Sequence, residues 1–161
     1  MRVLAFDPGF ERLGVAVVEK ESGKEKLLYS DCLRTEASLP FPERLALLGA
    51  AVEKLLEKWM PDAVALEDLY FAKNAKTAMK VAEVRGVLVY LAAARGIALY
   101  QYTPLQVKIA VTGYGASDKR AVAAMVPRLI DLPTSTRLDD EMDAIAVGLT
   151  CVASVRVYPQ K

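Results

Sequence analysis

Four carboxylates open the last apolar segment of the chain. Asp139, Asp140, Glu141 and Asp143 precede the run AIAVG. The helix dipole and N-terminal capping favour acids in a first helical turn, which accounts for the first three. They account less well for Asp143, which shares a helix face with Asp140 and with apolar residues. We expect neither a histidine nor a neighbouring lysine to partner this buried acid, so a divalent metal would meet the need.

Two more acids end strand-like segments. Asp7 closes residues 2–7 and Glu67 closes the apolar run AVALE, residues 63–67. A lone Asp before Pro-Gly is also ordinary turn chemistry. A helical crossover before residues 63–67, however, would make that strand parallel to the first and bring both acids to one sheet edge.

Carboxylates at the ends of adjacent parallel strands repel one another unless a cation or a proton lies between them. Four such groups from two strands and one helix are hard oxygen ligands that suit Mg²⁺ or Mn²⁺ rather than zinc. A cluster of this kind can hold two ions that activate water for displacement at phosphorus. The acids therefore predict a metal-dependent nuclease.

The charge is strongly segregated along the chain. Residues 73–128 carry 9 basic and 2 acidic side chains, whereas residues 1–72 carry a net charge of −4 and residues 129–161 a net charge of −2. A basic segment between acidic flanks is a possible footprint for a polyanion such as nucleic acid. Solvated lysines on helix surfaces would give the same count.

Length and composition predict one domain over residues 1–161, with 53% hydrophobic residues to form its core. No apolar run reaches the roughly 20 residues of a membrane span, and the N-terminus lacks the pattern of a secretory signal. We expect a cytosolic protein without a membrane partner, in which Cys32 and Cys151 are buried thiols.

Hydrophobic periodicity predicts ten elements that position these residues. Three strands with short turns form a meander, followed by helix, strand, helix, strand and three helices. The predicted order βββαβαβααα is that of a mixed α/β fold. The expected segments are residues 2–7, 13–20, 24–33, 42–59, 63–67, 75–95, 97–102, 104–113, 118–130 and 139–154.

The long helix from Ala75 to Arg95 is apolar on more than one face. One face contains Met79 and Gly86, and the other contains Val84 and Leu88. One face can pack on the sheet while the other meets a partner chain. Full burial inside one subunit is the alternative.

Several segments, in this order, carry a resemblance to a known family. They are LAFDPG, VALEDLYFAKNAKTAMKVAEVRGV, TPLQVKIAVTGYGASDKRAVAAMV and DDEMDAIAVGLT. Together they resemble the RuvC family of Holliday-junction resolvases. The D-P-G strand end alone is shared with many members of the RNase H-like superfamily, including YqgF-type nucleases. The AKNA and QVK…DK segments single out the RuvC family.

The resemblance implies an RNase H-like α/β fold, with a central mixed five-stranded sheet flanked by helices. It also implies a homodimer that binds four-way DNA junctions and cuts them by paired nicks in recombination and repair. The implied cofactor is Mg²⁺, two ions per site, with Mn²⁺ able to substitute. A RuvA–RuvB branch-migration complex is the implied physiological partner.

The family's functional residues fall on identifiable positions of this sequence. Its four metal-binding and catalytic acids fall on Asp7, Glu67, Asp140 and Asp143, with Asp139 as an alternative to Asp140. Its base-contacting aromatic residue falls on Tyr70, beside Phe71, and its functional lysines on Lys108 and the catalytic Lys119. The implied nucleic-acid-binding residues are Tyr70, Phe71, Lys73, Asn74, Lys76, Lys108 and Lys119.

Two other functions stay open at this point. One is an RNase H-like nuclease that acts on structured RNA, and the other is a protein that binds junctions without cutting them. The intact set of four acids argues against the second. An actin-like phosphotransferase would need a second glycine-rich phosphate loop and a much longer chain, and the sequence has neither.

Overall fold

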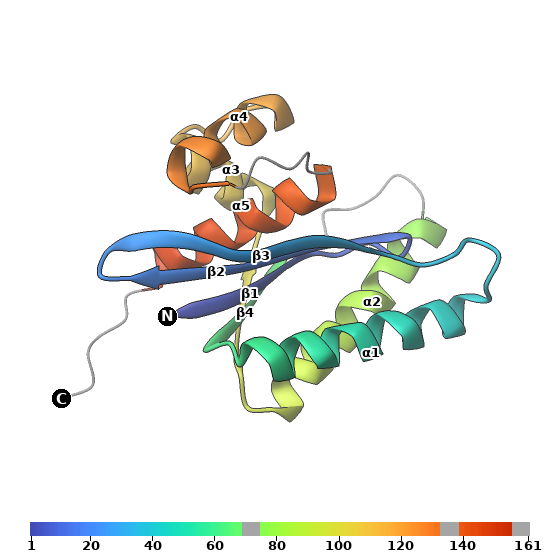
Figure 1. Ribbon diagram of the computed structural model, residues 1–161. Helices are drawn as coiled ribbons and strands as arrows, with labels where there is room; N and C mark the ends of the chain where they lie inside the picture. The colour runs from blue at the N-terminus through green and yellow to red at the C-terminus, as the bar shows by residue number, and fades with distance from the viewer. Residues whose placement is uncertain (69–74, 133–138, 156–161) are drawn as a thin grey trace.

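The computed structural model describes residues 1–68, 75–132 and 139–155, which contain ten elements in the predicted order (Figure 1). The strands are β1 (Arg2–Asp7), β2 (Arg12–Glu21), β3 (Lys24–Arg34), β4 (Ala63–Glu67) and β5 (Ala98–Tyr102). The helices are α1 (Phe41–Trp59), α2 (Ala75–Ala94), α3 (Pro104–Thr112), α4 (Lys119–Leu129) and α5 (Asp139–Ser154). The predicted element order is confirmed.

One five-stranded sheet has the strand order β3-β2-β1-β4-β5. The meander β1-β2-β3 is antiparallel, and a two-residue turn with positive φ at Ser22 and Gly23 joins its last two strands. Strand β4 runs parallel to both β1 and β5, with Leu4 opposite Val64. The mixed sheet is confirmed, and Asp7 and Glu67 end neighbouring parallel strands as expected.

Alternate residues of the sheet face two helical layers. In β1, Val3 and Ala5 face a core shared with α3, α4 and α5, whereas Leu4 and Phe6 face a core shared with α1 and α2. Figure 1 shows these two groups of helices on opposite sides of the sheet. Because side chains alternate along a strand, Asp7 follows Ala5 onto the α5 side.

Helix α5 is the central helix of its layer and contacts all five strands. Small residues let it lie close to the sheet. A Cβ atom added at Gly148 would lie 2.7 Å from Val18 Cγ2 and 3.3 Å from the Cβ of Ala5. This close packing brings the acidic first turn of α5 down to the strand ends.

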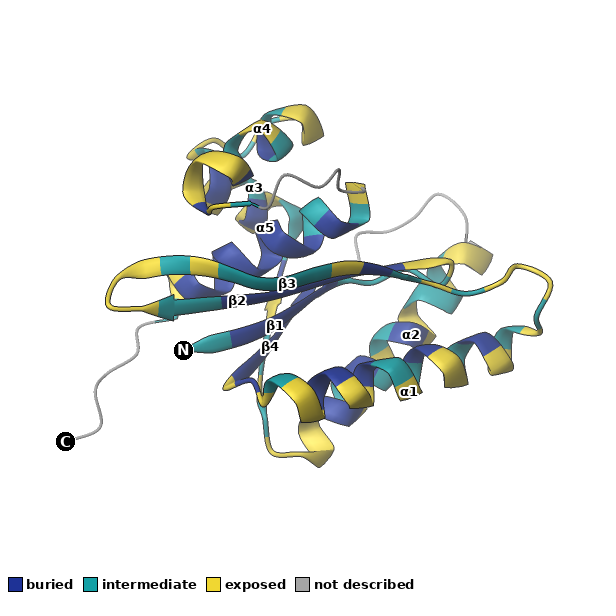
Figure 2. Ribbon diagram, viewed as in Figure 1, coloured by how far each residue is buried: buried dark blue, intermediate teal, exposed yellow. Residues whose placement is uncertain are grey.

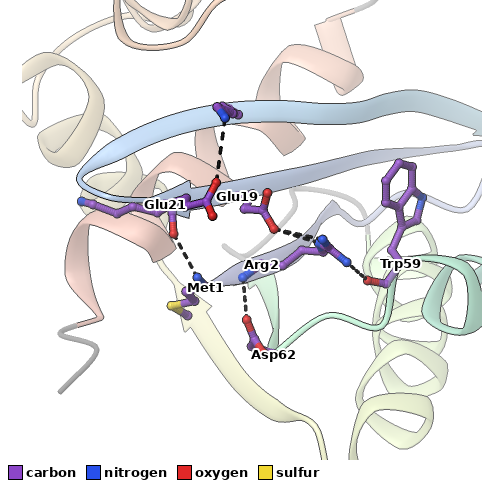
Figure 3. Close-up of polar contacts among 8 residues, drawn as sticks. Met1, Arg2, Glu19, Glu21, Trp59 and Asp62 are labelled. Atoms are coloured by element: carbon purple, nitrogen blue, oxygen red, sulfur yellow. Dashed lines mark hydrogen bonds and ion pairs between the residues drawn. The ribbon is translucent and has the colours of Figure 1, made fainter. Parts of the chain in front are cut away.

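The opposite end of β1 is fastened by Arg2 (Figure 3). The Arg2 guanidinium donates to Glu19 Oε1 at 3.0 Å and to the Trp59 carbonyl oxygen at 2.8 Å. Its backbone N–H donates to Asp62 Oδ2 at 2.7 Å. These bonds join β1 to β2, to the end of α1 and to the start of β4. They support the register that ends β1 and β4 side by side.

Helix α2 packs with one face and exposes another. Val84 and Leu88 are buried against the sheet, whereas Met79 is 65% exposed and Tyr90 is 69% exposed. Figure 2 shows exposed bands along α2 beside buried ones. The two-faced helix is confirmed, and its full burial inside one subunit is wrong. In the described ranges no helix is long and apolar enough to cross a membrane, and Cys32 and Cys151 are buried free thiols.

Candidate functional site

The four predicted acids approach one another at the carboxyl end of the parallel strands. Asp7 ends β1 and Glu67 ends β4, and Ala5, Ala63 and Ala65 show that this strand register faces α5. Asp140 and Asp143 lie in the first turns of that helix, each with a side chain 26% exposed. Two strands and one helix thus contribute acids to a single corner of the molecule.

A glycine in β2 lets the helix and the strand end approach this closely. Gly14 pairs with Asp7 across the antiparallel ladder. A Cβ atom at this position would lie 1.9 Å from the Asp140 carbonyl oxygen and 3.3 Å from Asp7 Cβ. No side chain fits in that space, so the glycine is required by the contact between β2 and α5 rather than by backbone conformation.

The electrostatics of the corner reflect crowded carboxylates. Burial raises the pKa of Asp7 to about 8, and the negative charges of Glu67, Asp143 and Asp140 add to that rise. Burial followed by the charge of Asp143 raises the pKa of Glu67. Burial also raises the pKa of Asp143, even though a cation contacts it. Asp7, Glu67 and Asp143 therefore hold a proton more readily than a solvated carboxyl group would.

The cation at Asp143 corrects one expectation from the sequence. Lys119 Nζ at the start of α4 lies 2.7 Å from Asp143 Oδ2, so a lysine does partner this acid. Burial lowers the lysine's pKa, but the hydrogen bond and charge of Asp143 outweigh it and raise the pKa overall. The sequence could not show this pair because its members lie on different helices.

A cavity of about 170 Å³ opens beside these groups. Glu67 and Asp143 line it together with Lys108 of α3 and Lys119. Lys108 is half-buried, and Lys119 keeps a side chain that is 59% exposed. Acids and cations thus share one opening, as a site for a phosphate bound near metal ions would require.

Asp140 and Asp139 differ sharply in their surroundings. The Asp139 side chain is 86% exposed, and its carboxylate lies 4.0 Å from Lys119 Nζ. Asp140 Oδ2 lies 3.6 Å from Arg12 Nη1 and 4.0 Å from the thiol of Cys32. Asp140 also contributes to the raised pKa of Asp7. The geometry therefore favours Asp140 as the helix acid that faces Asp7.

The donor set suits a hard divalent cation, although it is not assembled as a finished site. Within residues 1–68, 75–132 and 139–155, no three His, Cys, Asp or Glu side chains are gathered to hold a metal ion as they stand. Mutual repulsion of four carboxylates is nevertheless what a divalent cation relieves. In this structure Lys119 and Arg12 supply part of the positive charge that balances these carboxylates.

Tyr70, Phe71, Lys73 and Asn74 fall outside the described residues. Lys76 is exposed in the first turn of α2.

Sequence reasoning missed two residues at the site, Arg12 and Gly14. A glycine inside an apolar strand was the available signal for Gly14, because such a residue often marks a close approach of backbone.

Comparison with known proteins identifies relatives over nearly the whole chain. Residues 3–151 match the family model described as crossover junction endodeoxyribonuclease RuvC. A protein of that name from Ruminiclostridium cellulolyticum is 44% identical over 149 residues, covering 92% of this chain and 90% of the relative. One from Brevibacillus brevis is 40% identical over 150 residues, covering 93% and 90%.

The solved structures agree with this assignment. The structure of T. thermophilus RuvC in complex with Holliday junction substrate superposes with a TM-score of 0.86 at 35% identity. The match covers 93% of this chain and 92% of that one. Sequence, fold and the placement of the acids lead to the same assignment, and the chain belongs to the RuvC family of crossover junction endodeoxyribonucleases.

Proposed function

We propose that this protein is a structure-specific endonuclease that resolves four-way DNA junctions by paired, metal-dependent hydrolysis. The observation that carries the proposal is the cavity lined by Glu67, Asp143, Lys108 and Lys119, with Asp7 beside it. Acids that can hold cations and lysines that can hold phosphate converge there. Membership of the RuvC family, and a relative solved with Holliday junction substrate, support DNA junctions as the substrate.

Asp7, Glu67, Asp140 and Asp143 are the proposed metal ligands, for two Mg²⁺ ions per site with Mn²⁺ able to substitute. Bound ions would supply an activated water and would stabilise the oxygens of the displacement at phosphorus. Asp7 is half-buried among the other acids, which makes it the proposed shared ligand. Its raised pKa means that ion binding must release a proton near neutral pH.

The two lysines have separate proposed roles. The Lys119 side chain is 59% exposed and contacts the Asp143 carboxylate. We assign it to the developing negative charge on the phosphate, which it reaches when it turns from the carboxylate. Lys108, which lines the same cavity from α3, anchors a phosphate of the bound strand as a fixed charge.

The remaining DNA contacts are proposed for the segment that precedes α2. Tyr70 and Phe71 would stack on unpaired bases, a contact worth about 1–3 kcal/mol per base. Lys73, Asn74 and Lys76 would bind the backbone nearby. The order of the chain supports this assignment, because these residues follow Glu67 closely in the sequence.

The exposed face of α2 supports a homodimer as the working form. Met79 and Tyr90 lie three helical turns apart on one side of α2, and Gly86 lies between them with open space at its Cβ position. A flat apolar stripe of this kind suits an isologous contact between two copies. Two copies would supply one acidic site for each of the paired nicks. We also propose that the RuvA–RuvB complex is the physiological partner and that the protein is cytosolic.

Cleavage of defined substrates tests the function. The protein is incubated with a mobile four-way DNA junction, a linear duplex of matched sequence and a structured RNA, each with Mg²⁺ or with EDTA. Symmetric nicks confined to the junction, and only with Mg²⁺, are expected. Preferential cutting of RNA would establish the structured-RNA nuclease instead. Tight junction binding without any cleavage would establish the non-cleaving protein.

A further inference from the structure

Arg85 joins α2 to the strand end that carries Glu67. Its guanidinium donates to the Glu67 carbonyl oxygen, to the Gln101 side-chain oxygen and, at 3.1 Å, to Asp68 Oδ1. The Arg85 side chain is only 11% exposed. One residue of α2 thus holds the ends of β4 and β5 together.

Arg85 holds the end of β4 from the face of the sheet opposite the acids. Helix α2 packs on the side of the sheet that contains Leu66, whereas the Glu67 position follows Ala65 onto the α5 side. The Asp68 N–H donates to the Tyr102 carbonyl oxygen at 2.7 Å, which continues the pairing of β4 with β5 past Glu67. The guanidinium and the sheet ladder therefore fix the backbone at this point from two directions.

The three contacts of this side chain, with Glu67, Asp68 and Gln101, require an arginine. A guanidinium presents several N–H donors in a rigid planar fork, so it can bind a carbonyl, an amide oxygen and a carboxylate at once. A lysine carries the same charge on a single flexible atom and cannot reproduce the fork. In the described part of the chain Arg85 does not line the cavity beside Glu67, so any effect it has on the reaction passes through another residue.

We infer that Arg85 is a positioning residue for Glu67, which it holds at the depth in the sheet edge where its carboxylate faces Asp7. The inference rests on the proposed function, in which Glu67 is a metal ligand. Partners behind a metal ligand typically change metal affinity by about 10–100-fold when they are removed.

A change of charge and a loss of position predict opposite results. The positive charge of Arg85 lowers the pKa of Glu67, and it opposes the binding of a metal cation by simple repulsion. If charge were all that mattered, Arg85→Gln would bind metal more tightly than the wild type. If position matters, both Arg85→Gln and Arg85→Lys bind metal more weakly, because both lose the fork.

The experiment measures Mn²⁺ affinity of the full chain by electron paramagnetic resonance, beside thermal unfolding and single-turnover junction cleavage. Arg95→Gln is the matched control, because Arg95 follows α2 and pairs with Glu53 at 3.3 Å, apart from the acids. We expect both Arg85 variants to weaken Mn²⁺ binding about 10–100-fold and the control to leave it unchanged. Excess Mn²⁺ should restore most of the cleavage rate of Arg85→Lys.

Mn²⁺ affinity at or above the wild-type value in either folded Arg85 variant would overturn the inference, and so would equal weakening in Arg95→Gln. Arg85→Lys keeps the positive charge and most of the side-chain length. The test therefore relies on this variant if Arg85→Gln does not fold. The metal measurement needs no DNA. Failure of the wild type to cut junctions would therefore remove the proposed function while leaving the effect of Arg85 on Mn²⁺ affinity measurable.

Discussion

Lys119 Nζ lies 2.7 Å from Asp143 Oδ2, a close ion pair between the basic segment and the acidic helix. The pair places a partly exposed cation in the lining of the cavity beside Glu67. In the proposed reaction Lys119 stabilises negative charge on the phosphate. In the metal-free protein it pairs with the Asp143 carboxylate. That double use makes Lys119 the most informative side chain to remove.

Lys119→Ala should slow single-turnover junction cleavage by about 100–1000-fold, the usual effect of removing one group that stabilises transition-state charge. Junction affinity should fall much less, because the other cations of residues 73–128 remain. Arg120→Ala is the matched control, since Arg120 is the exposed neighbour on α4. Rate measurements at saturating protein, with binding measured in EDTA, separate the two effects. Equal losses in rate and affinity would make Lys119 a phosphate anchor only.

Substitutions at Asp139 and Asp140 should have unequal effects. Asp140→Asn should abolish cleavage with Mg²⁺, since its side chain is 26% exposed and faces the cluster around Asp7. Asp139→Asn should leave most of the activity, because its side chain is 86% exposed. The same junction assay compares both variants at equal concentration. Loss of activity in Asp139→Asn alone would show that the ligand is one residue earlier in α5.

The stability of the metal-free protein should increase as the pH falls from about 8 into the weakly acidic range. Burial and neighbouring acids raise the pKa values of Asp7, Glu67 and Asp143 in the folded state. Between the unfolded and folded values the folded protein binds more protons, so lowering the pH through that interval favours folding. Calorimetric unfolding in EDTA from pH 8.5 to 5 measures the trend.

Asp7→Asn is the control for that trend, because it removes the acid whose pKa is raised to about 8. Its unfolding temperature should depend less on pH than that of the wild type over the same interval. Saturating Mg²⁺ should reverse the slope for the wild type, since metal binding requires ionised ligands. A wild-type slope that persists unchanged in Asp7→Asn would place the responsible group elsewhere.

Gly14→Ala should destabilise the fold and impair cleavage together. The new methyl group would lie 1.9 Å from the Asp140 carbonyl oxygen, so α5 must move away from β2. Forcing an extra carbon into a packed region costs about 1–3 kcal/mol of unfolding free energy. Gly49→Ala is the control, because its Cβ would make ordinary contact with Val87 at 3.4 Å. That helical substitution should stabilise by about 0.5–1 kcal/mol.

Met79→Glu should convert a dimer to monomers. The side chain is 65% exposed on the apolar face of α2, and a charge buried in a contact between two copies would be unpaired. Sedimentation velocity measures the change in mass. Leu129→Glu, at an exposed position of α4, is the control and should leave the mass unchanged. A monomeric wild type, or a dimeric Met79→Glu, would contradict the assignment of this face.

The sequence was sufficient to predict the order of the elements and the meeting of Asp7 with Glu67. Those features follow from local periodicity and from the rule that a helical crossover joins parallel strands. The four acids were identifiable because a carboxylate at the end of a buried strand or on an apolar helix face requires a nearby cation or proton. Each of these inferences starts from a local pattern, and the crossover rule connects the two distant strands.

The rest depended on how helices pack, which local patterns do not determine. Lys119 and Asp143 belong to different helices, and Arg85 reaches Glu67 from the opposite face of the sheet. Arg12 approaches Asp140 only because Gly14 leaves room for α5. Side chains that meet through tertiary packing become visible only when the relative positions of the layers are known.

The central place of α5 has a consequence for the timing of activity during synthesis. Asp7 lies on the first strand, whereas Asp140 and Asp143 lie on the last helix, which contacts all five strands. A chain on the ribosome from which α5 has not yet emerged cannot bury this face of the sheet. It then lacks half of the proposed ligands, so a nascent or prematurely ended chain carries no complete nuclease. The protein can therefore cut DNA in the cell only after α5 has been synthesised.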